Sequence, residues 1–232
     1  GVAPNANLLS VALYGLAYTD ANGDRQIIDY GTSDYDDFVV SSGATVINGS
    51  WTSSGASDAL QTKIENMADN GASSLVQVFA AGNDSNSNPD YPARYASDSD
   101  VANGEMIAVV AYDADTDDIA SLSNRCGDAQ NFCLMAPGKY IYSTYNSGGY
   151  EVSSGTSMAA PVVSGAVAVI QSAWPSLSGS EIVTLLVDTA VDYGTSGNDS
   201  TYGAGLLDLN AAVVSQGSKG AALGFEEKVF AY

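Results

Sequence analysis

The sequence predicts an α/β fold in which helices flank a parallel β-sheet. Apolar and glycine-rich segments alternate along all 232 residues, which is typical of strands and helices that follow one another. With 45% hydrophobic residues, the chain is long enough to bury one sizeable core. No internal repeat or linker composition divides it, so we expect a single domain.

Short apolar runs predict the strands of the sheet. Their length and composition are those of strands buried on both faces, as in parallel sheets. The strongest candidates are residues 8–13, 44–48, 75–81 and 106–112, and the shorter ones are residues 134–136 and 140–143.

Boundary signals predict the helices. Ser57 is the expected N-cap of a helix that ends at Gly71. Ser178 and Glu181 have the spacing of a capping box, which starts another helix that runs to residue 187. The other expected helices are residues 34–42, 156–173 and 206–214, whereas residues 84–90 and 194–200 have the composition of loops.

Charge and hydropathy exclude several partners. The formal net charge is −20, and a surface this acidic repels phosphate backbones and anionic lipid headgroups. The longest apolar run, residues 159–170, is too short to span a bilayer and contains Pro161, so it predicts a buried core helix. We therefore expect no nucleic-acid partner and no membrane insertion by this chain.

The chain has two cysteines, Cys126 and Cys133, with six residues between them. This spacing is too long for a CxxC redox motif, and a zinc site would need further ligands in a chain without histidine. We prefer a local disulfide that closes a surface loop, worth about 2.5 kcal/mol in the chain-entropy treatment. Such a bond would indicate an oxidising, extracytoplasmic compartment.

Ser157 is the first candidate for chemistry. It precedes an apolar helical run, so the positive end of the helix dipole lies behind it and its own N–H can face a developing oxyanion. Small neighbours would allow a substrate backbone to approach. The alternative is that Ser157 is an ordinary N-cap.

Asn83 is the second candidate. It follows an apolar strand and a glycine, and an asparagine just past the carboxyl end of a strand can point its amide into a cleft. Taken alone, Gly-Asn after a strand is more often a simple turn.

Together these two segments resemble the subtilisin-like serine proteases, or subtilases. Residues 155–161 (GTSMAAP) resemble the nucleophile motif of that family, and residues 80–83 (AAGN) resemble its oxyanion-hole motif. Other segments also resemble subtilase motifs and occur along the chain in the same order as in the family: GVAPNA at 1–6, VINGSW at 46–51, YPARY at 91–95, MAPG at 135–138 and YGAGL at 202–206. The cysteine-containing passage also resembles subtilase passenger domains of Gram-negative autotransporters. The resemblance implies a subtilase catalytic domain over residues 1–214, followed by a tail over residues 215–232.

The resemblance implies peptide hydrolysis by acyl transfer. Ser157 would attack the scissile carbonyl, and the Asn83 side chain with the Ser157 N–H would hold the oxyanion. Substrate would bind along Ser50 and Trp51 and against Ala81 and Gly82. The residue before Tyr-Pro forms part of the floor of the primary specificity pocket in this family. Here that residue is Asp90, which would attract a basic P1 side chain, unless it is a solvated turn residue.

The sequence departs from the family in containing no histidine. In subtilases the catalytic aspartate and histidine motifs precede the segment that resembles Gly1 onward, and the aspartate strand lies between those that match residues 8–13 and 44–48. The resemblance therefore implies a sheet missing its N-terminal strand, and a partner segment that supplies both residues. Without a base, Ser157 is a weak nucleophile and this chain alone would be inactive.

The remaining expectations concern cofactors, location and alternatives. No cofactor is required and no metal ligand is assigned; calcium commonly supports this fold, but its best-known site lies in the absent segment. We expect an extracellular or cell-surface location and a protein or peptide substrate. The rival hypothesis is an inactive scaffold or binding protein, which would need neither Ser157 nor Asn83. An α/β-hydrolase lipase fits poorly, because Ala159 replaces the second glycine of its elbow.

Overall fold

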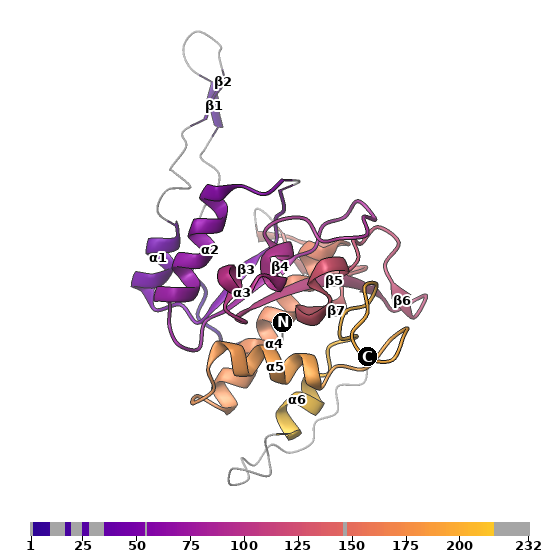
Figure 1. Cartoon of the computed structure of the whole chain (residues 1–232). Coiled ribbons are helices and arrows are strands. Elements are labelled where there is room, and N and C mark those ends of the chain that lie inside the picture. Colours follow the sequence, from indigo (N-terminus) through magenta and orange to yellow (C-terminus); the bar gives the residue numbers. More distant parts are fainter. Residues whose placement is uncertain are drawn as a thin grey trace.

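The computed structural model describes residues 2–9, 17–19, 25–27, 35–53, 55–145 and 148–215, and it is an α/β sandwich around one parallel sheet (Figure 1). The parallel strands are β3 (Val46–Gly49), β4 (Val76–Ala80), β5 (Met106–Asp113) and β7 (Cys133–Pro137), which lie in this order. The short β6 (Asp118–Ile119) turns back antiparallel to the end of β5. A separate ribbon, β1 (Ala17–Thr19) with β2 (Arg25–Ile27), is antiparallel.

Helices cover both faces of the sheet (Figure 1). One face carries α1 (Tyr35–Ser42), α2 (Asp58–Asn70) and α3 (Ser99–Ala102), and the other carries α4 (Thr156–Ala173), α5 (Gly179–Asp188) and α6 (Leu209–Ser215). Two 3₁₀ helices, η1 (Ala93–Ser97) and η2 (Gly127–Phe132), follow β4 and β6. The expected α/β architecture is confirmed.

The protein has two hydrophobic cores, one on each face of the sheet, because successive strand residues point to opposite faces. Val76, Val78 and Ala80 of β4 pack with α4 and α5, whereas Phe79 packs with α2 on the other side. All five residues of β4 are buried, which is why this strand reads as a continuous apolar run rather than as an alternating one.

The helix boundaries show which terminal signals act. The capping box of α5 is formed by Ser178 and Glu181, as predicted. Ser57 occupies the N-cap of α2 but makes no side-chain capping bond. Gly71 ends α2 with φ −70°, so a left-handed turn is not the reason for glycine there. A Cβ on Gly71 would lie 2.4 Å from the Met67 carbonyl oxygen, so close approach excludes a side chain.

Three predicted elements differ from the structure. Leu8 and Leu9 are in no strand and are strongly exposed, so the strand prediction over residues 8–13 is wrong there, and residues 10–13 lie outside the described residues. The final helix starts at Leu209 rather than 206, because Leu206 bridges Met135 and Val191. The predicted strand over residues 140–143 is β8 (Ile141–Thr144), which pairs with the unpredicted β9 (Tyr150–Ser153).

Helix α4 is the central helix of the fold. Among the described residues it is the one helix long and apolar enough to cross a membrane. Its inner face is fully buried against β3, β4, β5 and β7, which is the packing of a core helix. In the part of the chain that is described, β3 pairs on one side only, with β4, so its other edge is open. The tail from residue 216 lies outside the described residues, and the domain limit stays a prediction.

Candidate active site

Ser157 is the second residue of α4, and its backbone is positioned by Gly155. Gly155 has φ +149°, and a Cβ there would lie 3.3 Å from Asn83 Oδ1, so both backbone conformation and space favour glycine. The Ser157 hydroxyl is half-buried and donates to the Ser50 carbonyl oxygen at 3.2 Å. Ser50 Oγ in turn donates to the Ser157 carbonyl oxygen at 2.9 Å. These two bonds join the start of α4 to the end of β3.

Asn83 follows β4 and reaches the same helix start. Its Oδ1 accepts hydrogen bonds from Thr156 N at 2.9 Å and from Thr156 Oγ1 at 3.1 Å. Thr156 Oγ1 also accepts from Gly82 N at 3.1 Å, which fixes the threonine. The carboxamide is therefore oriented by its oxygen, and its Nδ2 donates to no described residue. Asn83 is exposed, so this donor is open to a ligand.

The backbone N–H of Ser157 is a second open donor. It is one of the first-turn amides that have no partner within the helix, and it makes no hydrogen bond to any described residue. Two unfilled donors, one from a side chain and one from a helix N-terminus, thus lie at the same end of α4. Such a pair can stabilise a developing oxyanion.

The predicted substrate-binding residues lie around these donors. Trp51 follows β3 and packs edge-on against Phe79 of β4, with ring centroids 6.0 Å apart. Ser53 and Tyr91 form an antiparallel bridge with N–O distances of 2.7 and 3.0 Å. The structure therefore brings together the segments that follow β3, β4 and Pro89, and a role of these segments in binding substrate stays a prediction.

Asp90 lies directly against the loop that carries Asn83. Its N–H donates to the Ala81 carbonyl oxygen at 2.8 Å, and its Oδ2 lies 2.4 Å from the point that a Cβ on Gly82 would occupy. Burial raises the pKa of the Asp90 carboxyl and the charge of Asp84 adds to this, although hydrogen bonds from Asn124 and Asn86 oppose it. Gly82 has φ +107°, so glycine is required here for conformation and for space.

Two functional candidates were missed from the sequence. Thr156 orients Asn83, and Asn124, which is fully buried, bonds to the loop on both sides of Asn83. Thr156 stands inside the recognised motif, so its position was available as a signal. Asn124 carries no local signal, because burial of an asparagine between two loops is a tertiary property.

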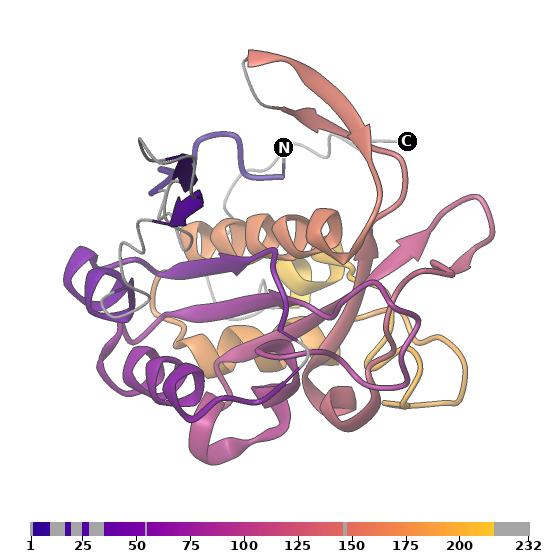
Figure 2. The same cartoon turned by 90° about the horizontal axis from the view of Figure 1, so that it is seen from above.

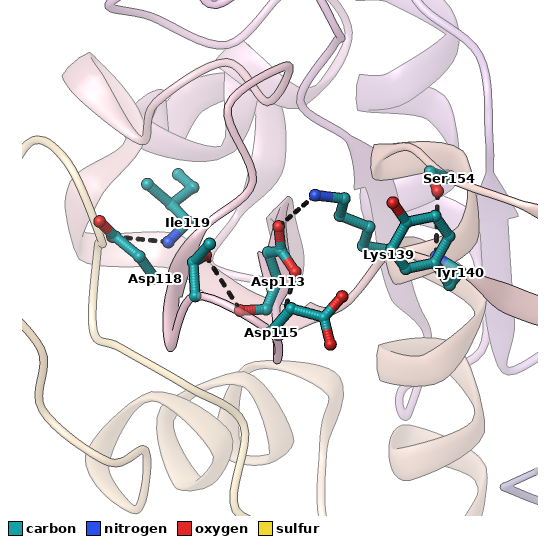
Figure 3. Close-up of polar contacts among 8 residues, drawn as sticks. Asp113, Asp115, Asp118, Ile119, Lys139, Tyr140 and Ser154 are labelled. Atoms are coloured by element: carbon teal, nitrogen blue, oxygen red, sulfur yellow. Dashed lines mark hydrogen bonds and ion pairs between the residues drawn. The ribbon is translucent and has the colours of Figure 1, made fainter.

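The segment before Ser157 is anchored to β5. Figure 3 shows the ion pair between Lys139 Nζ and Asp113 Oδ2, 2.5 Å apart, and the hydrogen bond from Tyr140 N to Ser154 Oγ at 2.9 Å. Hydrogen bonding by Lys139 is the main cause that lowers the pKa of Asp113. Gly155 N also donates to the Gly138 carbonyl oxygen at 2.7 Å. The segment that leads from β8 and β9 into α4 is therefore held in place by these bonds.

Cys126 and Cys133 form the predicted disulfide, with Cα atoms 5.7 Å apart. Both residues are fully buried, so the bond belongs to the core beneath η2 rather than to an exposed loop. A Cβ on Gly203 would lie 2.8 Å from Cys126 Sγ, which shows how closely the loop after Asp199 covers the bond. Among the residues described, no three Asp, Glu or Cys side chains gather as metal ligands, so a calcium site stays a prediction without a location.

The chain is similar in sequence to several known proteins. Residues 1–205 match the family model Peptidase_S8, described as the subtilase family. Subtilisin DY of Bacillus licheniformis is 35% identical over 91% of this chain and 70% of its own length. The extracellular serine protease of Serratia marcescens is 35% identical over 59% of this chain but only 15% of its own length. The serotype-specific antigen 1 of Mannheimia haemolytica is 34% identical over 61% of this chain and 16% of its own length.

Solved structures show the same fold. The prenylagaramide maturation protease PagA superposes with a TM-score of 0.63 at 25% identity, covering 77% of this chain and 64% of that protein. The S218A mutant of the PatA protease domain also has a TM-score of 0.63, at 24% identity, with 77% of this chain and 62% of that domain covered. The chain thus spans less than two thirds of either solved protein.

Proposed function

The chain belongs to the subtilase family of serine proteases, and from this we propose that it supplies the nucleophile and oxyanion hole of a serine endopeptidase. Ser157 attacks the scissile carbonyl of a protein or peptide substrate. Asn83 Nδ2 and the Ser157 N–H hold the oxyanion. The observation that carries the proposal is the pair of open donors at the start of α4, which are held in place by Thr156 and Gly155.

The base must come from another segment. The Ser157 hydroxyl donates to a main-chain carbonyl, which cannot accept its proton during attack. We propose that a segment carrying the aspartate and histidine of the family completes the site. The second edge of β3 supports this: it has no partner strand among the described residues, and an unpaired edge strand is a template for another strand.

The outer side of α4 also supports the docking of another segment. Met158, Val162 and Val169 are apolar but only half-buried, and Pro161 is exposed. Figure 2 shows residues 2–9 lying over this same side of α4, and Val2 approaches Gly165 so closely that a Cβ there would lie 2.7 Å from Val2 Cβ. A docked segment would cover the remaining apolar surface.

Labelling with a fluorophosphonate tests the proposal, since this reagent reacts only with an activated serine. Mass spectrometry of the assembled protease, with the aspartate–histidine segment present, should show one adduct, on Ser157. This chain alone should give none. An adduct on another serine, or an assembled protease that neither labels nor cleaves peptides, would sink the proposal.

Specificity is proposed to depend on Asp90. Its carboxylate lies beside the Gly82–Asn83 turn, where it would pair with a P1 arginine or lysine and disfavour an apolar side chain. Two peptides that differ only in P1 arginine or phenylalanine give the test. The assembled protease should prefer arginine at least about tenfold in kcat/KM, and Asp90→Asn should remove most of this preference. Equal cleavage of both peptides would refute the role of Asp90 and leave the protease assignment standing.

We also propose an extracytoplasmic location. The buried disulfide supports it, because such bonds persist in oxidising compartments. One similar protein, from Serratia marcescens, is named an extracellular serine protease. Non-reducing mass analysis of the natural protein, recovered from each cell fraction, would locate the oxidised form.

A further inference from the structure

Asn124 lies between β6 and η2 and is packed against the loop that follows β4. Its side chain is 0% exposed. On the side that precedes Asn83, the Asn124 backbone N–H donates to the Gly82 carbonyl oxygen and its Nδ2 donates to the Ala81 carbonyl oxygen, both at 2.9 Å. A buried side chain with this many partners is costly to replace, because each lost bond leaves a buried polar group unpaired.

On the side that follows Asn83, the same carboxamide accepts two hydrogen bonds. Asn124 Oδ1 receives the backbone N–H of Asp84 at 3.0 Å and that of Asn86 at 2.9 Å. One side chain therefore holds the main chain both before and after Asn83. These bonds act together with those that join Ser85 to Ser121 and Leu122 and Arg125 to Asn86, and they restrain the backbone from which the exposed Asn83 amide projects.

The third neighbour of the carboxamide is Asp90. Asn124 Nδ2 and Asp90 Oδ2 lie 2.3 and 2.4 Å from the same point, the position of a Cβ on Gly82. The Ala81 carbonyl oxygen accepts from both Asn124 Nδ2 and Asp90 N. Asp90 and the Asn83 loop therefore share Asn124 as a common support, and glycine at position 82 leaves the space for it.

We propose that Asn124 is a positioning residue that couples Asp90, at the specificity pocket, to the Asn83 donor of the oxyanion hole. The inference rests on the proposed function and deepens it. Asn124 touches neither substrate nor reacting atoms. It sets where Asn83 Nδ2 and the Asp90 carboxylate stand, so that one buried carboxamide affects both the rate of acyl transfer and the choice of P1 side chain.

The test measures kcat and KM of the assembled protease on the two peptides that differ in P1 arginine or phenylalanine. Asn124→Ala should lower kcat about 10- to 100-fold, the cost of a misplacement near 1 Å, and lower the arginine-to-phenylalanine ratio at least about threefold. Asn70→Ala is the matched control, because the Asn70 carboxamide bonds only to Asn66 one turn back in α2. A role in stability alone would lower Tm without moving the ratio.

A second variant and a second measurement keep the test decisive. Asn124→Asp is isosteric and keeps an oxygen for the Asp84 and Asn86 amides, so kcat should fall less than in Asn124→Ala. It removes the Nδ2 donor that faces the Ala81 carbonyl oxygen and Asp90, so the arginine-to-phenylalanine ratio should still fall at least about threefold. Amide exchange at Asp84 and Asn86 should be at least about tenfold faster in Asn124→Ala and nearly unchanged in Asn124→Asp. If Asn124→Ala does not fold, kcat and ratio in Asn124→Asp decide.

Each outcome separates the two proposals. A wild-type protease that cleaves neither peptide contradicts the proposed function, and amide exchange then still decides whether Asn124 holds the loop. A cleaving wild type, with Asn124 variants that match Asn70→Ala in kcat, ratio and exchange, overturns the positioning role alone.

Discussion

At the scale of single residues, hydrogen bonds and backbone conformation fix the orientation of the side chains at the candidate site. Asn83 is held by its oxygen, which accepts from Thr156, so its nitrogen is left to face a ligand. Positive φ favours glycine at both Gly82 and Gly155, and at Gly82 a Cβ would also clash with Asn124 and Asp90. The proposed chemistry of Ser157 thus depends on the residues that hold its neighbours in place: Thr156 orients Asn83, and the two glycines set the backbone.

Replacing Asn83 should affect the transition state more than the ground state. In the assembled protease, Asn83→Ala should lower kcat about 10²- to 10³-fold with little change in KM, because one of two oxyanion donors is lost. Steady-state kinetics on one peptide measures this. A loss smaller than tenfold would remove Asn83 from the mechanism. Asn198→Ala is the control. Asn198 lies in an exposed loop, and among the described residues its carboxamide donates a hydrogen bond only to Asn131.

Glu105 should make the stability of the chain depend on pH. It is 8% exposed, and burial, with the nearby charge of Asp69, raises its pKa from 4.5 to about 7. The folded state therefore holds the proton more tightly than the unfolded state. The free energy of unfolding should fall as pH rises from 4.5 to 7, by about 1–3 kcal/mol at about 1.4 kcal/mol per pKa unit.

Denaturant titrations at several pH values check this. Glu105→Gln should remove the decrease and make the protein more stable than wild type at pH 8, whereas Glu151→Gln on the exposed β9 should change nothing. An unchanged pH dependence in Glu105→Gln would show that Glu105 ionises as an ordinary surface acid.

At the scale of secondary-structure elements, two serines that precede helices in the sequence differ in whether they cap the helix. Ser57 and Ser178 both stand at helix N-caps, but only Ser178 accepts a bond from the helix, from Glu181 N at 3.3 Å. The Glu181 carboxylate also accepts from Ser178 N at 2.8 Å. The local sequence pattern therefore located both helix starts, but only the structure shows which serine side chain makes a capping hydrogen bond.

The two serines provide a matched pair of substitutions. Ser178→Ala should lower the free energy of unfolding by about 1 kcal/mol, the usual cost of a lost N-cap. Ser57→Ala should cost less than about 0.3 kcal/mol, because no capping bond is lost. Urea unfolding of both variants compares them directly. Equal effects would mean that Ser57 caps α2 in solution.

For the whole molecule, two features agree with the proposed docking of an aspartate–histidine segment: among the described residues β3 pairs only with β4, and the outer side of α4 is half-buried. These surfaces lie on the same side as residues 2–9 in Figure 2. The start of α4, which carries Ser157, is bonded to Ser50 at the end of β3. Completion of the core and completion of the active site are therefore proposed to be one event.

Adding the aspartate–histidine segment should stabilise this chain. At a concentration 100-fold above Kd the gain is about 2.7 kcal/mol, since binding favours the folded state. Amide exchange should slow in β3 and along α4, with little change in α5 on the far side of the site. Ser157→Ala should respond as wild type does, because docking needs no chemistry. Unaltered exchange in β3 would contradict docking at that edge.

The sequence by itself determined the α/β class, strands β4 and β5, helices α4 and α5, and the motif residues Ser157 and Asn83. The elements follow from local patterns, namely apolar runs and capping signals, and the motif residues follow from short motifs that occur together in one order along the chain. The disulfide also followed from spacing, and the structure confirms it.

Tertiary structure alone showed the contacts of Asn124 and Thr156 and the pairing of β8 with β9, and it rejected a strand at Leu8 and Leu9. Each depends on contacts between segments far apart in the chain. Asn124 bonds to residues about 40 positions away, and Thr156 to one 73 positions away. No local pattern reports which distant backbone groups a buried side chain will meet, so the supports of this site became visible only once the chain was folded.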